Sequence, residues 1–412
     1  MKNDMPRSER ILMMLIIIFF AVPLPLTFLA HVGPLKKSLR MGHLKGILPQ
    51  TDYTPFSWSA VFNAKYQASV GRFFDNEFFG RPGLIELTDE LYFRLFKISP
   101  MKSTLAVVGK KETLFEDLYW NEYVLNRVRK EQLLPLIINL KQMQELYRSR
   151  GKGFVVVITP SKASVYPELL PAGWERRYDP RPRGYDQFLP LLREQGIHYV
   201  DGHAIATTAR DSSDVPVFPK GGIHWGAYTA FLTANAVIAE LQSQGKPLQL
   251  LHYTNYRVLN TPPEQDADIL QLLNLMFPWH YPVVDFDIKP VPVTGHRPNM
   301  VIVGGSFIWR MTDFLNDSRQ FSEIDCFYYY KVRKKSFYDG KSRIISEPVQ
   351  SVDFDREIFA ADNLVLEINE SFISNIPNHL DKFTTDALQH AATSPNPSPA
   401  PAYLYENTQP AQ

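Results

Sequence analysis

Short apolar runs alternate with longer segments of helical periodicity through the middle of the chain. Runs of β-branched and other apolar residues, typical of strands buried on both faces of a parallel sheet, occur at 154–158, 301–303 and 364–368. Further strands are expected at 197–200 and 327–330. Helical spacing of apolar residues covers 122–149, 185–195, 225–242 and 307–315. The pattern predicts an α/β protein, a three-layer α/β/α sandwich around a mainly parallel sheet.

The two ends of the chain depart from this pattern. Residues 11–30 form an uncharged apolar run, long enough to cross a bilayer. We predict one transmembrane signal anchor there, after a cytoplasmic segment 1–10; a cleaved signal peptide is the alternative. Basic residues lie on both sides of the run, so charge does not set its orientation. A linker is expected over 31–57, one α/β domain over 58–385, and a disordered tail rich in Pro, Ser and Ala over 386–412.

Charge and cysteine content exclude some functional classes. The chain has 44 Lys and Arg residues against 43 Asp and Glu residues, which argues against a nucleic-acid partner. Its single cysteine, Cys326, rules out an intrachain disulfide and argues against a cysteine-based zinc site.

Two glycine-rich turns carry candidate chemistry. Gly304-Gly305-Ser306 follows an apolar strand and precedes a helix, the arrangement in which α/β proteins present a nucleophile. The serine is alternatively a helix N-cap. His224 follows Gly221-Gly222 at the start of another predicted helix. It is either a core or capping residue, or a general base for Ser306.

Several separated segments resemble the SGNH-hydrolase-like domain of the alginate O-acetyltransferase family, bacterial envelope proteins that acetylate exopolysaccharides. The similarity extends from Phe74 to Glu370, over most of the chain. The matching segments are Phe74-x-x-x-Phe78-Phe79-Gly80-Arg81, Val107-Val108-Gly109-Lys110 with Leu114-Phe115, Val157–Lys162 with Val165-Tyr166-Pro167 and Leu170-Pro171, His224-Trp225, Gly304–Phe307, and Leu366–Glu370.

The resemblance implies Ser306 as the acyl-accepting nucleophile and His224 as its base. It also implies a protein anchored in the inner membrane with its main domain in the periplasm. The expected partners are a polysaccharide substrate and a membrane-bound O-acyltransferase that supplies acetyl groups. Neither a metal nor a cofactor is implied, and no nucleotide or coenzyme A motif is visible.

Two residues depart from the family pattern. Gly222 stands where the family has its triad aspartate, and Gly305 replaces the aspartate before the serine. Three explanations for Gly222 remain open: another carboxylate replaces the acid, a Ser–His dyad acts alone, or catalysis is lost. The candidate replacements on predicted loops are Asp201, Asp214 and Asp268.

Two further residues are candidates for substrate contact. Trp225 beside the histidine is suited either to stacking on a sugar ring or to core packing. Lys162, just after a strand, either faces a ligand or lies solvated on a loop. The functional hypotheses are therefore an exopolysaccharide O-acetyltransferase, a non-catalytic binding or scaffold subunit of an exopolysaccharide assembly, and an acetyl esterase.

Overall fold

The structure is a computed structural model that describes residues 6–22, 25–27, 29, 44–45, 53–99, 105–345 and 349–393. The chain divides into two units. The N-terminal unit comprises residues 1–107 and 269–279, and the unit that we call the sheet unit comprises residues 108–268 and 280–412.

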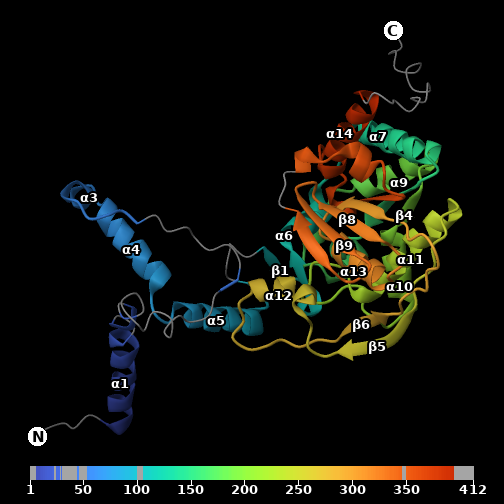
Figure 1. Ribbon diagram of the computed structural model, residues 1–412. Coiled ribbons are helices and arrows are strands. Elements are labelled where there is room, and N and C mark those ends of the chain that lie inside the picture. Colours follow the sequence, from blue (N-terminus) through green and yellow to red (C-terminus); the bar gives the residue numbers. More distant parts are fainter. Residues whose placement is uncertain are drawn as a thin grey trace, which may run out of the picture. The chain divides into compact units, whose positions relative to one another are not determined.

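A seven-stranded mixed sheet forms the centre of the sheet unit (Figure 1). Its strand order is β10-β9-β8-β7-β11-β3-β4. The strands are β3 (Gly153–Thr159), β4 (Tyr199–Asp201), β7 (Met300–Gly304), β8 (Glu323–Tyr328), β9 (Val332–Phe337), β10 (Ser342–Ile345) and β11 (Asn363–Asn369). Strands β8, β7, β11, β3 and β4 pair in parallel. Consequently β7, β11 and β3 present their carboxyl ends at one edge, where the serine turn lies.

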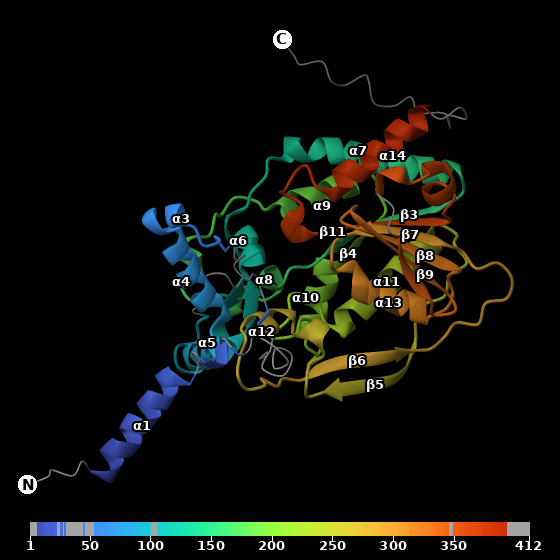
Figure 2. The same cartoon turned by 60° about the vertical axis from the view of Figure 1, so that its left-hand side comes forward.

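Helices cover both faces of this sheet (Figure 2). One face carries α7 (Lys130–Ser149), α9 (Gly184–Glu194) and α14 (His379–Thr393), and the other carries α10 (Gly202–Ser212), α11 (Ala227–Ser243) and α13 (Ile308–Asp317). Side chains alternate along β3: Phe154 and Val156 enter the first core, whereas Val155 and Val157 enter the second. The three-layer α/β/α arrangement predicted from the apolar runs is therefore present.

Three details differ from the sequence predictions. The sheet is mixed, because β9 and β10 add an antiparallel edge whose charged residues do not read as strands. The helix expected over 122–149 is two helices, α6 (Asp117–Leu125) and α7, because Asn126 and Arg129 adopt extended backbone conformations. The predicted tail begins too early, because α14 continues to Thr393 and buries Ala387. Residues 394–412 lie outside the described part of the chain.

An insertion between α11 and β7 carries a second, two-stranded sheet. Strand β5 (Tyr253–Leu259) pairs antiparallel with β6 (Val283–Ile288). The chain between them forms η6 (Glu264–Asp266) and α12 (Asp268–Leu272). This insertion contributes acidic residues to the site described below.

Shorter elements complete the sheet unit and its boundary with the preceding chain. They are β1 (Ala106–Val108), η3 (Lys110–Glu112), β2 (Leu114–Glu116), α8 (Lys162–Val165), η4 (Pro167–Leu169), η5 (Trp174–Arg176), η7 (Val349–Ser351), η8 (Phe354–Ile358) and η9 (Glu370–Phe372).

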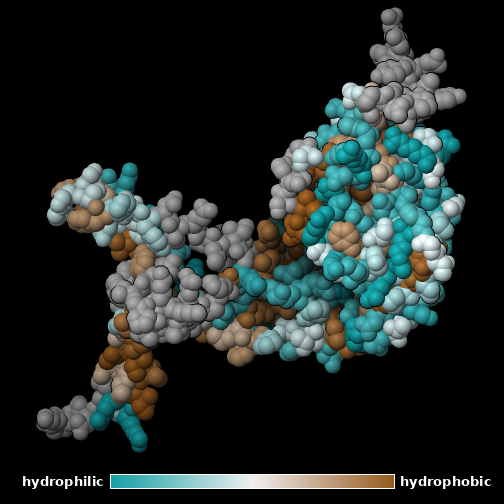
Figure 3. Space-filling view, in the orientation of Figure 1, coloured by the Kyte–Doolittle hydropathy of each residue, from teal (hydrophilic) through white to brown (hydrophobic). Residues whose placement is uncertain are grey.

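The N-terminal unit is helical in its described residues. It contains α1 (Arg7–Ala21), α3 (Trp58–Phe62), α4 (Lys65–Glu77), α5 (Arg81–Leu91) and η2 (Tyr92–Phe96). No helix of the described residues combines the length and apolar character needed to span a bilayer. Side chains from Ile11 to Ile18 are nevertheless exposed, and Figure 3 shows α1 largely in brown. Parts of the predicted anchor (11–30) and most of the predicted linker (31–57) lie outside the described residues.

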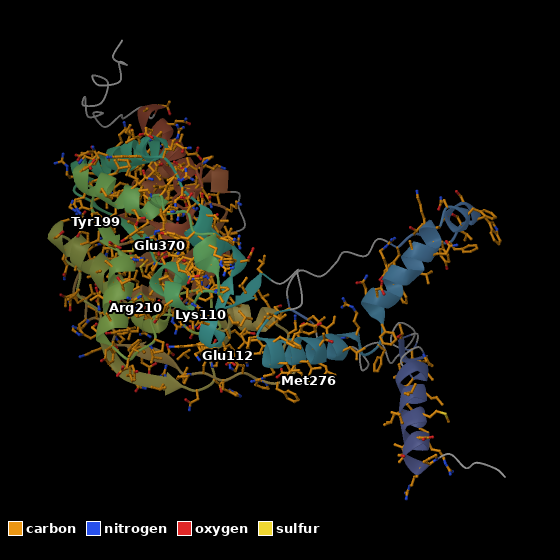
Figure 4. The ribbon with its side chains drawn as sticks, turned by 180° about the vertical axis from the view of Figure 1, so that it is seen from behind. Lys110, Glu112, Tyr199, Arg210, Met276 and Glu370 are labelled. Atoms are coloured by element: carbon orange, nitrogen blue, oxygen red, sulfur yellow. The ribbon has the colours of Figure 1, made fainter. Side chains whose placement is uncertain are left out.

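A buried charge cluster closes the end of β11. Glu370 accepts hydrogen bonds from the backbone N–H of Ser161 (2.6 Å) and the hydroxyl of Ser164, and it pairs with His203 (3.0 Å) and Arg183 (3.4 Å). Glu370 lies inside the sheet unit (Figure 4). Burial favours the protonated acid, but His203, Arg183 and Ser164 outweigh it and hold the pKa of Glu370 at about 2. The partnership with Glu370 raises the pKa of His203 despite its burial.

These shifts predict a pH window for the stability of the sheet unit. The contribution of Glu370 is present above the ordinary glutamate pKa of about 4.3 and is lost as pH falls towards its folded value. The contribution of His203 is complete below about pH 6.5 and is lost as pH rises through its raised pKa. Glu370→Gln is therefore expected to lower the free energy of unfolding by about 3–5 kcal/mol between these limits, and by less at pH 3. Urea unfolding of both proteins across pH checks this, and a pH-independent difference would contradict it.

Candidate active site

The turn after β7 holds Ser306 at the carboxyl edge of the sheet. The N–H of Gly305 donates a hydrogen bond to Oε2 of Glu367 on the neighbouring strand β11 (2.6 Å). A Cβ on Gly304 would lie 2.6 Å from that oxygen and 2.5 Å from Ile308, so only glycine permits this approach. Burial raises the pKa of Glu367 to about 7, and the hydrogen bonds from Thr159 and Gly305 oppose the shift. The sheet thus fixes the serine turn through a buried carboxyl group.

Two tyrosines contact Ser306. Burial raises the pKa values of both phenols, and Ser306 lies close enough to Tyr119 and Tyr329 to oppose these shifts. The ring of Tyr329 packs so closely on Gly305 that a Cβ there would lie 3.1 Å from it. The glycine that replaces the family aspartate therefore makes room for a tyrosine over the serine.

The second turn brings His224 to a carboxylate. Its Nδ1 lies 2.7 Å from Oδ2 of Asp268, whose Oδ1 accepts the backbone N–H of Ile223 at 2.6 Å. A carboxylate at Nδ1 favours the tautomer that carries its proton there and leaves Nε2 as the free base. Nε2 is buried and has no hydrogen-bond partner among the described residues. Asp268 therefore orients the imidazole, whereas Nε2 makes no hydrogen bond to Ser306.

Asp268 reaches His224 from the insertion between α11 and β7. A Cβ on Gly222 would lie 2.7 Å from Cγ of Pro219 and 2.9 Å from the backbone oxygen of Asp266. The segment that delivers Asp268 thus occupies the space of an aspartate side chain at position 222. Of the three explanations for Gly222, replacement by another carboxylate matches this geometry.

Close packing at Gly222 predicts a cost for any larger residue. Gly222→Ala is expected to lower the free energy of unfolding by about 1–3 kcal/mol, because neither the proline ring nor the backbone of Asp266 can move freely. Thermal unfolding compared with wild type checks this. If Gly222→Ala left the stability unchanged, or if Gly222→Asp raised it, the segment around Asp266 would be able to move aside, and the prediction would be wrong.

Ser306, His224 and Asp268 line one cleft of about 510 Å³ in the sheet unit. Phe307 separates the two turns, with its ring centroid 5.0 Å from that of His224. Arg310 and Asp266 complete the polar lining, and burial raises the pKa of Asp266 to about 6 against the opposing charge of Arg310. The cleft therefore combines a hydroxyl, an oriented imidazole and a cation.

Asp201 and Asp214 lie outside the cleft, and Trp225 lies at its wall but is buried. Asp201 caps α10 and accepts a hydrogen bond from Tyr185. Asp214 is exposed on a bend. Trp225 is 1% exposed and packs edge-on against Phe307, so its ring cannot stack on a sugar in this conformation.

Lys162 is buried rather than solvated or facing the cleft. Its ammonium donates hydrogen bonds to the backbone oxygens of Leu114 (3.0 Å), Pro219 (2.7 Å) and Gly222. Burial lowers the pKa of Lys162, and the nearby Asp268 carboxylate opposes that shift. Lys162 therefore stabilises the turn before His224 and does not make the predicted substrate contact.

Sequence reasoning missed several residues near the site. Tyr119, Tyr329 and Arg310 carry no motif, and their segments meet Ser306 only in the fold. Glu116 also lies within electrostatic reach, because burial and Asp268 raise its pKa while His224 lowers it. Directly after β8, Tyr329 and Tyr330 both have positive φ (48° and 52°), a backbone conformation that these residue types do not indicate.

Residues 107–291 match the family model described as SGNH hydrolase-like domain, acetyltransferase AlgX. Over these residues, which are less than half of its length, the chain is similar to the SGNH hydrolase-like domain of AlgX. The match confirms the resemblance seen in the sequence. It includes His224 and Asp268, whereas Ser306 lies beyond the matched residues. No curated protein sequence matches the chain.

Solved structures of this kind give weak overall matches. The O-acetyltransferase domain of Pseudomonas putida AlgJ is 19% identical with a TM-score of 0.45, over 69% of this chain and 97% of that domain. Pseudomonas aeruginosa AlgX is 15% identical with a TM-score of 0.44, over 66% of this chain and 67% of that chain. Bacillus cereus PatB1 is 9% identical with a TM-score of 0.41, over 67% of this chain and 98% of that chain. At these scores the matches add nothing on function.

Proposed function

We propose that this protein is an O-acetyltransferase that acts on an exopolysaccharide through an acetyl-serine intermediate. The observation that carries the proposal is the Asp268–His224 pair: Asp268 orients His224, and His224 lines the same cleft as Ser306. An oriented imidazole beside a serine hydroxyl is the usual activator of that nucleophile. The insertion thus supplies the acid that the sequence lacked at Gly222.

The first half-reaction loads the serine. Ser306 Oγ turns from the tyrosines to Nε2 of His224, gives up its proton there and attacks the carbonyl carbon of an acetyl donor. The C–O or C–S bond to the leaving group breaks, and the leaving group takes the proton from His224. The backbone N–H of Ser306 and the Tyr329 hydroxyl are placed to donate hydrogen bonds to the oxyanion.

The second half-reaction frees the serine. A sugar hydroxyl gives its proton to His224 Nε2 and attacks the acetyl carbonyl carbon. The ester bond to Ser306 breaks, and Oγ recovers the proton. Water in place of the sugar gives hydrolysis, so an acetyl esterase uses the same residues.

One measurement tests the chemistry. The protein is incubated with p-nitrophenyl acetate, and its peptides are then mapped by mass spectrometry. We expect one acetyl group on Ser306 and release of p-nitrophenol. An acetyl group on another residue would contradict the proposal, and so would the lack of both an adduct and p-nitrophenol release. The protein would then be a non-catalytic binding subunit. That second candidate is favoured by Nε2 of His224, which has no hydrogen bond to Ser306 or to any other described residue.

We also propose that residues 11–30 anchor the protein in the inner membrane, with the sheet unit in the periplasm and a membrane-bound O-acyltransferase as acetyl donor. The exposed apolar residues from Ile11 to Ile18 support an environment other than water. Protease treatment of spheroplasts is expected to degrade the sheet unit. Protection of the sheet unit, or its release in a salt wash, would contradict the arrangement.

A further inference from the structure

A groove of about 1070 Å³ lies next to the catalytic cleft in the sheet unit. Gln265 and Arg310 line both the groove and the cleft, so the two spaces adjoin at these residues. The walls come from the β5–β6 hairpin, from α13 and from the β9–β10 hairpin. A chain-like ligand held in this groove would have one end or one residue at Ser306.

The charges in this groove are nearly balanced, and several of them are paired with one another. Five Arg or Lys residues and four Asp residues line it. Arg257 pairs with Asp285 (2.9 Å) and Asp287 (2.5 Å), and Arg310 also contacts Asp285 (3.3 Å). These cations already have carboxylate partners and are poorly available to a polyanion.

Lys341 and Lys334 also have neighbours that satisfy their charges in part. Lys341 pairs with Asp339 (3.1 Å), and the ammonium of Lys334 lies 5.5 Å from the ring centroid of Trp309. Asp313 and Asp317 face the groove from α13. Burial raises the pKa of Asp317, and the nearby charge of Arg319 opposes this shift. Carboxylates here repel a uronate chain and accept hydrogen bonds from hydroxyl groups.

Two further features suit a sugar chain. Tyr338, 52% exposed at the β9–β10 turn, offers an aromatic face with a hydroxyl. Nε of Arg310 is buried and has no hydrogen-bond partner among the described residues, at the point where groove and cleft join. A ligand oxygen is the acceptor that this donor lacks.

We propose that this groove binds a neutral, hydroxyl-rich polysaccharide, and that the acceptor presented to Ser306 is therefore a neutral glycan rather than a polyuronate such as alginate. The inference deepens the proposed function and rests on it for the reaction, whereas binding in the groove does not depend on catalysis.

Binding is tested with the full-length Ser306→Ala protein, which cannot turn over an acceptor. Calorimetry compares a neutral glucan oligosaccharide with an alginate oligosaccharide of the same length. We expect the glucan to bind at least about tenfold more tightly, with little change between low and high salt because no net charge is neutralised. Tighter binding of alginate, binding that weakens steeply with salt, or no binding of the glucan would overturn the proposal.

A second variant tests glycan binding in the groove separately from ester cleavage at Ser306. Tyr338→Ala is expected to weaken glucan binding by about tenfold and to leave p-nitrophenyl acetate cleavage unchanged. Tyr53→Ala, which removes another exposed tyrosine from the N-terminal unit, is the matched control for glucan binding. Glucan binding without Ser306-dependent cleavage would refute the proposed function alone. Ser306-dependent cleavage with a preference for alginate would refute the groove assignment alone.

Discussion

Replacing Ser306 with alanine is expected to lower the rate of acetate release from p-nitrophenyl acetate by at least about 10³-fold, because the nucleophile is lost while the cleft remains. The acetyl adduct should disappear with it. The measurement is initial-rate kinetics beside intact-protein mass spectrometry. Equal release by wild type and variant would remove the acyl-enzyme mechanism.

Ser164 provides a matched control for this substitution. It too lies beside a histidine and a glutamate, but its Oγ and the Glu370 carboxylate both contact the same nitrogen, Nδ1 of His203. A serine, an imidazole and an acid arranged in this way cannot relay a proton, because a triad uses both ring nitrogens. Ser164→Ala should therefore retain ester cleavage, although its thermal stability should fall.

Asp268→Asn is expected to lower kcat by about 10³–10⁴-fold with a small effect on KM. The amide donates to Nδ1 where the carboxylate accepts, which favours the tautomer with its proton on Nε2 and disables the base. A merely structural role would instead change stability without this split between kcat and KM. Recovery of part of the rate in Asp268→Glu would support the assignment.

Asp214→Asn is the matched control for the acid. This aspartate was an equal candidate in the sequence and is exposed on a bend in the structure. It should keep the wild-type rate. Loss of activity in Asp214→Asn, with Asp268→Asn unaffected, would reverse the assignment.

Much of this site could be predicted from local patterns, and the acid could not. The serine and histidine follow strands and glycine turns that are recognisable over a few residues, and the apolar runs at 154–158, 301–303 and 364–368 are the buried strands β3, β7 and β11. Asp268 lies in an insertion whose path depends on tertiary packing. Nothing within its own segment distinguished it from Asp201, which ends a strand as catalytic residues often do but caps a helix here.

Burial selected core packing, one of the two alternatives for Trp225, and excluded both alternatives for Lys162. Lys162 and Trp225 lie beside motif residues, so both were candidates for ligand contact, yet each is nearly inaccessible. The sequence shows which residues are adjacent along the chain but not which side of the backbone they occupy. Edge strands β9 and β10 were missed for a related reason, because half-exposed strands with Lys and Arg lack an apolar run.

The environment of Lys162 has a consequence for how the histidine turn keeps its shape. Backbone oxygens from Leu114, Pro219 and Gly222 converge on one ammonium group, much as carbonyls in other proteins surround a potassium ion. Here the cation is covalently attached and cannot exchange with the solvent. The turn that carries His224 is therefore held by a cation that a change in the salt around the protein cannot remove.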